Sequence, residues 1–144
     1  MSTDPHLGHV HLKVRDLDRS VTFYERMLDL TERERHHRYA FLSWGDHHHD
    51  VALQAIGEDA PPPGPGVGLY HAAVEVPDAA TLTEIYDRLI DAGVGVTPVD
   101  HGISRALYFD DPDGNGLEVY RDTRAEREIE TWGGRNDRFD PSDS

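Results

Sequence analysis

Two histidines and one glutamate have the residue types and the spacing of a metal site. His9 and His71 each open an alternating apolar segment, and they occupy equivalent positions of an internal repeat with an offset of 62 residues. Glu118 lies in an otherwise apolar segment, directly after the turn-forming residues 111–115. A buried lone carboxylate costs several kcal/mol unless a cation or another partner compensates it. We therefore expect these three side chains to bind one metal ion.

The ligand set also indicates which metal to expect. Two imidazoles and one carboxylate form the facial triad of non-haem Fe(II) sites, which leaves open positions for a substrate and oxygen. Ligand type alone also permits Mn, Zn, Co or Ni. The first half of the chain offers no carboxylate as a fourth ligand, because Ala52 and Gln54 stand at the place that corresponds to Glu118. The prediction is a divalent metal, Fe(II) before the others, with three protein ligands.

The internal repeat predicts the elements that position these ligands. Residues 8–30 align without a gap on residues 70–92, and both copies read as an alternating strand, an aspartate near a turn and an amphipathic helix. Apolar residues at helical spacing mark the helices: Val21, Tyr24 and Leu28 in the first copy, and Leu82, Ile85 and Leu89 in the second. Short strands are predicted after the helices, at 31–35, 39–44 and 51–56 and at 95–99, 105–109 and 117–121.

These elements predict an α+β protein made of two paired βαβββ modules that form a mixed-sheet cleft. The modules are residues 1–60 and 69–122, joined by a Pro- and Gly-rich linker at 61–68. Residues 123–144 form a charged tail, helical at first, and we expect 136–144 to be disordered. Each module is too small to bury its sheet alone, so the two must pair, either within one chain or across a homodimer.

The composition excludes several classes of function. A net charge of −14 leaves no basic stripe for a nucleic-acid partner. No apolar run is long enough for a membrane span, and the polar first residues do not resemble a signal peptide, so a cytoplasmic protein is expected. Without cysteine, the chemistry must use imidazole, carboxylate or hydroxyl groups. The acidic excess, with Lys13 as the only lysine among 14 basic residues, favours adaptation to high salt.

Over roughly residues 7–121 the chain resembles the vicinal oxygen chelate superfamily, and within it the extradiol dioxygenases of the catechol 2,3-dioxygenase type. The resemblance rests on Gly8-His9, on Tyr70-His71 and on the closing phrase of residues 108–118, which ends in Glu118. It implies a glyoxalase-like fold and iron bound by His9, His71 and Glu118. It also implies cleavage of a small aromatic diol with O2.

The same resemblance implies three catalytic side chains. Tyr108, ten residues before Glu118, corresponds to a tyrosine that contacts the site where the substrate and oxygen meet. His49, in the pair His49-Asp50, resembles the acid and base of the family, and His101 resembles a further histidine beside the ligands. Ring cleavage requires a proton to leave the diol and to return later, and histidine titrates in the range that allows both.

Three other readings remain open. An isomerase, lyase or epimerase of the glyoxalase type would use the same scaffold, but its four-ligand pattern needs a carboxylate near Ala52 or Gln54. A transferase of the fosfomycin-resistance type would need basic residues around a phosphonate. A binding protein of the bleomycin-resistance type would need no metal, and the retention of His9, His71 and Glu118 argues against it.

Overall fold

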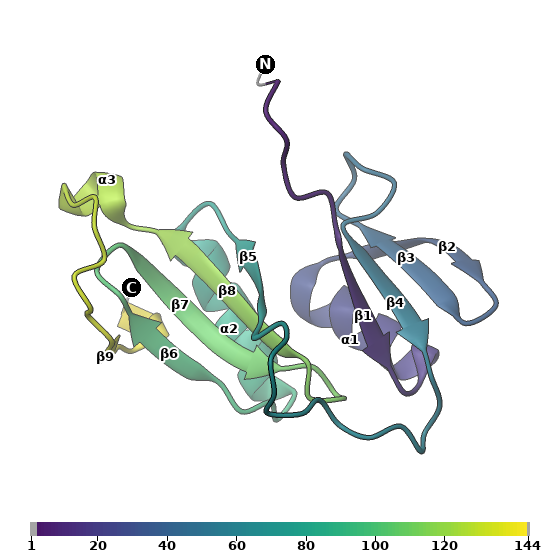
Figure 1. Cartoon of the computed structure of the whole chain (residues 1–144). Helices are drawn as coiled ribbons and strands as arrows, with labels where there is room; N and C mark the ends of the chain where they lie inside the picture. The colour runs from purple at the N-terminus through teal and green to yellow at the C-terminus, as the bar shows by residue number, and fades with distance from the viewer. Residues whose placement is uncertain (1–2, 144) are drawn as a thin grey trace. The chain divides into compact units, whose positions relative to one another are not determined.

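The computed structural model describes residues 3–143 and divides into two compact units, Met1–Pro62 and Pro63–Ser144. Each unit has its own mixed β-sheet and one long helix (Figure 1). The order strand, helix, strand, strand, strand is the same in both, so the predicted βαβββ repeat is confirmed. No helix within residues 3–143 is long and apolar enough to cross a bilayer.

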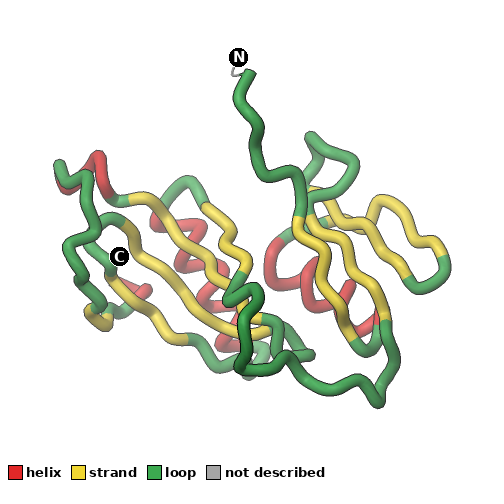
Figure 2. Tube along the Cα trace, in the orientation of Figure 1, coloured by secondary structure: helices red, strands yellow, loops and turns green. Residues whose placement is uncertain are grey.

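The first unit is a four-stranded sheet in the order β1-β4-β3-β2. Its elements are β1 (Val10–Val14), α1 (Leu17–Leu28), β2 (Thr31–His36), β3 (Tyr39–Ser43) and β4 (Val51–Ala55). The first strand pairs in parallel with β4, and the other pairs are antiparallel. Helix α1 lies against one face of the sheet (Figure 2), and its predicted apolar residues Val21, Tyr24 and Leu28 are buried there.

The second unit repeats this topology and adds one strand. Its elements are β5 (Ala72–Glu75), α2 (Ala79–Asp91), β6 (Thr97–Asp100), β7 (Ser104–Asp110), β8 (Gly116–Asp122) and β9 (Asp137–Arg138), and the sheet order is β5-β8-β7-β6-β9. Leu82, Ile85 and Leu89 of α2 are buried, as the helical spacing predicts.

The two long helices begin in the same way. The side chain of Asp16 accepts a hydrogen bond from the backbone N of Arg19, and that of Asp78 accepts one from Thr81. In both cases an aspartate in extended conformation satisfies an amide that has no partner inside the helix. The aspartate that recurs in the repeat is therefore an N-cap.

The C-terminal segment differs from the prediction. Disorder was expected for 136–144, and this is wrong for 136–143: β9 pairs with β6, and a short 3₁₀ helix (Pro141–Asp143) follows. Pro141 is buried, and its backbone O accepts a hydrogen bond of 2.8 Å from Thr83 Oγ1 on α2. The charged composition did not reveal this order, because the segment is held by strand pairing and by the buried Pro141, while its charged side chains, as far as the structure describes them, stay exposed. Ser144 lies outside the described residues.

Asp100, at the end of β6, anchors this segment. Its side chain is only 3% exposed and forms a bidentate ion pair with Arg127 of the short helix α3 (Arg124–Arg127), at 2.7 and 2.9 Å. Arg105 and Arg135 also donate to the same carboxylate, at 3.3 and 3.4 Å. The hydrogen bonds from Arg127 hold the pKa of Asp100 well below its usual range, although burial opposes them. A buried carboxylate thus ties β6 to two points of the tail.

Deleting residues 136–144 should lower the free energy of unfolding by about 2 kcal/mol, because burial of Pro141 and the pairing of β9 are lost. Urea denaturation of the full and shortened chains measures the difference. The variant Ser142→Ala, at an exposed position of the same segment, is the control. Equal midpoints for the full and shortened chains would contradict docking of the segment.

Replacing Asp100 by Asn should lower the free energy of unfolding by roughly 3 kcal/mol at neutral pH, because three arginines lose a buried anion. Since the folded-state pKa of Asp100 is depressed, its stabilising effect is complete above the unfolded pKa of about 4 and is lost as the pH falls further. Urea denaturation at a series of pH values should therefore give free energies of unfolding for wild type and variant that become equal as the pH falls. Asp137→Asn, at an exposed ion pair, should give a small and constant difference.

Candidate functional site

The second unit brings two of the predicted metal ligands together. His71 directly precedes β5, and Glu118 lies in β8, where it pairs with Ala73 of β5. The atoms His71 Nε2 and Glu118 Oε1 are 3.0 Å apart. Glu118 is 9% exposed, so its carboxylate is almost fully withdrawn from water.

A glycine makes this approach sterically feasible. A Cβ on Gly116, the first residue of β8, would lie 2.5 Å from the backbone O of Tyr70. No side chain fits in that space, so the backbone of residues 70–71 can lie directly against the start of β8. Gly116 is thus the reason that His71 comes within reach of Glu118.

The pair fits a divalent ion. Two ligands at right angles on one ion, each about 2.0–2.2 Å from it, lie roughly 3 Å apart, close to the separation of His71 Nε2 and Glu118 Oε1. His71 Nδ1 is buried and has no hydrogen-bond partner among the described residues. No cluster of three or more His, Cys, Asp or Glu side chains able to hold an ion occurs among residues 3–143. The contact of His71 with Glu118 thus brings together two of the three side chains that the sequence predicts as ligands.

The remaining predicted ligand, His9, belongs to the first unit and lies beside His49. Their ring centroids are 4.4 Å apart, and His49 Nδ1 is 3.0 Å from His48 Nδ1. Burial, followed by the charge of His9, lowers the pKa of His49, which favours a neutral ring able to accept a proton. Asp50, the other member of the pair His49-Asp50, accepts a hydrogen bond from the backbone N of Trp44 at 2.9 Å with its carboxylate. That His9 joins His71 and Glu118 at one ion stays a prediction.

Strand pairing identifies the counterpart of Glu118 in the first unit. In the parallel pair β5 and β8, Ala73 faces Glu118; in the equivalent pair β1 and β4, His11 faces Ala52. Because His11 and Ala73 are equivalent in the repeat, Ala52 takes the place of Glu118. Gln54, two residues further along, hydrogen-bonds His11 Nε2 at 3.0 Å. The first unit therefore offers no carboxylate at this position.

Tyr108 lies directly opposite Glu118 in the antiparallel pair of β7 and β8. Its hydroxyl lies 2.7 Å from His101 Nε2. Burial, followed by the charge of Glu118, raises the pKa of Tyr108 to about 12. At neutral pH this hydroxyl thus keeps its proton and can donate it in a hydrogen bond.

His101 follows β6 and connects Tyr108 to the C-terminal segment. Its Nδ1 lies 2.7 Å from Asn136 Oδ1 and 3.2 Å from the backbone O of Arg135. Trp132 meets the His101 ring edge to face, with centroids 6.2 Å apart. The sequence did not predict Asn136 or Trp132 as site residues; the one available signal was a large aromatic residue within a charged tail.

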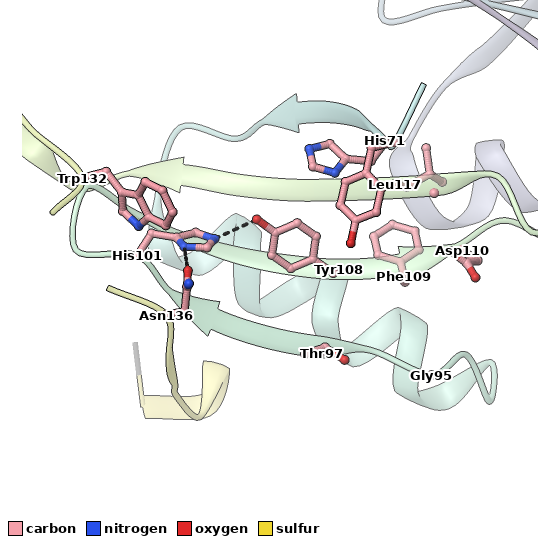
Figure 3. A pocket seen from close by; sticks show the side chains of 12 residues that line it. His71, Gly95, Thr97, His101, Tyr108, Phe109, Asp110, Leu117, Trp132 and Asn136 are labelled. Atoms are coloured by element: carbon pink, nitrogen blue, oxygen red, sulfur yellow. Dashed lines mark hydrogen bonds between the residues drawn. The ribbon is translucent and has the colours of Figure 1, made fainter. Parts of the chain in front are cut away.

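These side chains line a cavity of about 720 Å³ in the second unit (Figure 3). The lining residues are Tyr70, His71, Gly95, Thr97, His101, Tyr108, Phe109, Asp110, Gly116, Leu117, Trp132 and Asn136. Four of them are aromatic, and none of these described residues is Lys or Arg. The cavity suits a flat, weakly charged molecule that presents hydroxyl groups to the imidazoles.

A family model matches most of the chain. Residues 6–119 match the model of the Glyoxalase/Bleomycin resistance protein/Dioxygenase superfamily. The chain belongs to this superfamily. A glyoxylase/bleomycin resistance protein/dioxygenase domain from Frankia sp. EAN1pec has a similar structure, with a TM-score of 0.69 and 27% identity over 83% of this chain and 99% of that chain. The predicted α+β, glyoxalase-like fold is confirmed.

The relatives that resemble this chain in sequence include dioxygenases and a transferase. Catechol-2,3-dioxygenase of Bacillus subtilis is 35% identical over 90% of this chain and 44% of its own length. Biphenyl-2,3-diol 1,2-dioxygenase 2 of Rhodococcus globerulus is 30% identical over 85% of this chain and 65% of its own length. Glutathione transferase FosA of Serratia marcescens is 32% identical over 84% of each chain. The chain thus spans less than two thirds of both dioxygenases.

If this superfamily member binds a metal through Glu118, Glu118→Gln should weaken binding at least tenfold, because an amide of the same size removes the anionic ligand. Competition with a metal-sensitive dye measures the dissociation constant, and elemental analysis the stoichiometry. Glu75→Gln, an exposed change on the neighbouring strand β5, is the control. Equal affinity of wild type and Glu118→Gln would exclude Glu118 as a ligand.

Proposed function

We propose that the chain is a metal-dependent extradiol dioxygenase that cleaves the ring of a catechol-type diol with O2. The observation that supports this most strongly is one aromatic-walled cavity that contains His71, the partner of the buried Glu118, together with the hydrogen-bonded pair Tyr108 and His101. Aromatic walls suit the ring of the diol.

In this proposal His9, His71 and Glu118 hold the metal, with Fe(II) first and Mn, Zn, Co or Ni as other choices. His9 comes from the first unit of the same chain or of a second copy in a homodimer. When bound, Fe(II) supplies a Lewis acid for both diol oxygens and a redox link between the diol and O2.

The protein groups around the metal handle binding and protons. Tyr70 and Trp132, two aromatic residues that line the cavity and are exposed, offer their rings for stacking on the ring of the diol. Tyr108, whose pKa is raised to about 12, keeps its proton well above neutral pH and donates a hydrogen bond to developing negative charge. His49 takes the proton that leaves the diol and returns it later, and His101 supports Tyr108.

Two of the compared relatives that share most of this chain are dioxygenases of aromatic diols by name, which supports the proposed substrate class. Because the chain spans 44% and 65% of those proteins, the activity of the whole relatives is not carried over without a test. The high negative charge favours assay in high salt.

A second candidate is another enzyme class on the same scaffold: a transferase, or an isomerase or lyase. It is favoured by chain length, because this chain and the transferase from Serratia marcescens each align over 84% of their residues. One feature counts against each of these alternatives. The described lining of the cavity has no Lys or Arg with which a transferase of this type could bind a phosphonate. Ala52 stands where an isomerase or lyase of the glyoxalase type would need a carboxylate as its fourth metal ligand.

To test the proposal, the protein is loaded anaerobically with Fe(II) in high salt and mixed with a panel of catechols and O2. We expect a yellow ring-fission product, followed by absorbance, with one O2 consumed per product. His71→Ala should lower the rate at least a thousandfold, because a metal ligand is lost. His36→Ala, an exposed histidine on β2, should leave the rate unchanged.

Bound metal without colour from any catechol would contradict the dioxygenase proposal and favour an isomerase or lyase. Absence of bound metal in the wild type would favour a metal-free binding protein.

A further inference from the structure

We infer that Asn136 in the C-terminal segment is a positioning residue: together with the backbone carbonyl of Arg135, it holds His101 in the tautomer that carries its proton on Nδ1. The Nε2 atom is then left as an acceptor facing Tyr108. The catalytic meaning of this arrangement rests on the proposed function, whereas the tautomer itself can be measured without any substrate.

The hydrogen-bond partners of Nδ1 identify the tautomer. A backbone carbonyl only accepts hydrogen bonds, and the O of Arg135 lies 3.2 Å from His101 Nδ1. The side-chain oxygen of Asn136 lies 2.7 Å from the same nitrogen. Two acceptors at one ring nitrogen require that nitrogen to carry the proton. Neutral His101 is therefore the Nδ1–H tautomer.

Nε2 consequently has a free lone pair, 2.7 Å from the hydroxyl of Tyr108. The tyrosine hydroxyl can then donate its proton to the His101 ring. If His101 took the other tautomer, its Nε2–H would point at Tyr108, and the hydroxyl could only accept from the ring. The tail thus decides whether Tyr108 is the donor or the acceptor in its hydrogen bond with His101, which Figure 3 shows together with the bond between His101 and Asn136.

The residues that fix the tautomer are themselves held in place. Trp132 Nε1 donates to the same Arg135 carbonyl at 2.9 Å, so this carbonyl is oriented by two donors. Asn136 directly precedes β9, whose pairing with β6 fixes its register, with Asp137 opposite Asp100. Asp100 in turn binds Arg127 and Arg135 from the tail. The tail is thus anchored on both sides of the contact with His101.

The test records ¹⁵N chemical shifts of the His101 ring in the full, metal-free chain, above the pH range in which histidine is protonated. The signal is assigned by its absence in His101→Gln. In the wild type we expect a protonated Nδ1 and a bare Nε2. Asn136→Ala should shift the ring to a mixture of both tautomers, because one of the two acceptors is lost. Asn136→Asp keeps an oxygen at the same place and should restore the Nδ1–H form.

Arg138→Ala, an exposed change in β9, is the matched control and should leave the ¹⁵N shifts unchanged. Urea midpoints close to that of the wild type show that each variant folds. With an active iron form, Asn136→Ala should lower kcat about tenfold, the effect of one hydrogen bond of roughly 1.4 kcal/mol, with little change in KM. Asn136→Asp should recover most of kcat.

An Nε2–H tautomer in the wild type, or an unchanged Nδ1–H form in Asn136→Ala, would overturn the inference whatever the enzyme assay gives. A tautomer shift in a protein that cleaves no catechol would instead contradict the proposed function and leave the positioning role of Asn136 intact.

Discussion

The burial of the Glu118 carboxylate is the constraint around which the second unit is organised. A carboxylate withdrawn from water in the middle of a sheet is costly unless polar or charged groups surround it. The chain meets this cost with His71 on one side and the hydroxyl of Tyr108 on the other. Both partners depend on backbone features: Gly116 admits the segment of His71, and the pairing of β7 with β8 sets Tyr108 opposite Glu118.

Local patterns were enough to predict the two βαβββ units. The repeat contains the same aspartate cap, the same helical spacing and the same alternation twice, and each copy reinforces the interpretation of the other. Strand ends shifted by one or two residues; the largest shift is in the strand expected at 95–99, which begins at Thr97 because the backbone N of Val94 still bonds back to Leu89 of α2 and closes the helix. Such end effects depend on single hydrogen bonds that periodicity does not reveal.

The site was predictable only within residues 7–121, the part of the chain that carries the repeat and the resemblance. His71, Glu118, Tyr108 and His101 were identified from position and residue type, and the structure joins them by direct contacts. Asn136 and Trp132 were missed because both act through contacts with His101, which is 35 residues from Asn136 in the sequence. Composition does not reveal contacts between residues so far apart in the chain. A tail rich in charge resembles a disordered one until the buried Asp100 that binds it is known.

The match to the superfamily ends at residue 119, before the segment that carries Trp132 and Asn136. The part that matches the family model thus holds the carboxylate and its imidazole, while residues beyond the match complete the wall of the cavity. Two such regions can change at different rates during evolution. Gene duplication followed by drift in the residues beyond the match alone would give paralogues with one conserved chemistry and divergent ligand preference, so that similarity measured over the shared core says little about what each copy recognises.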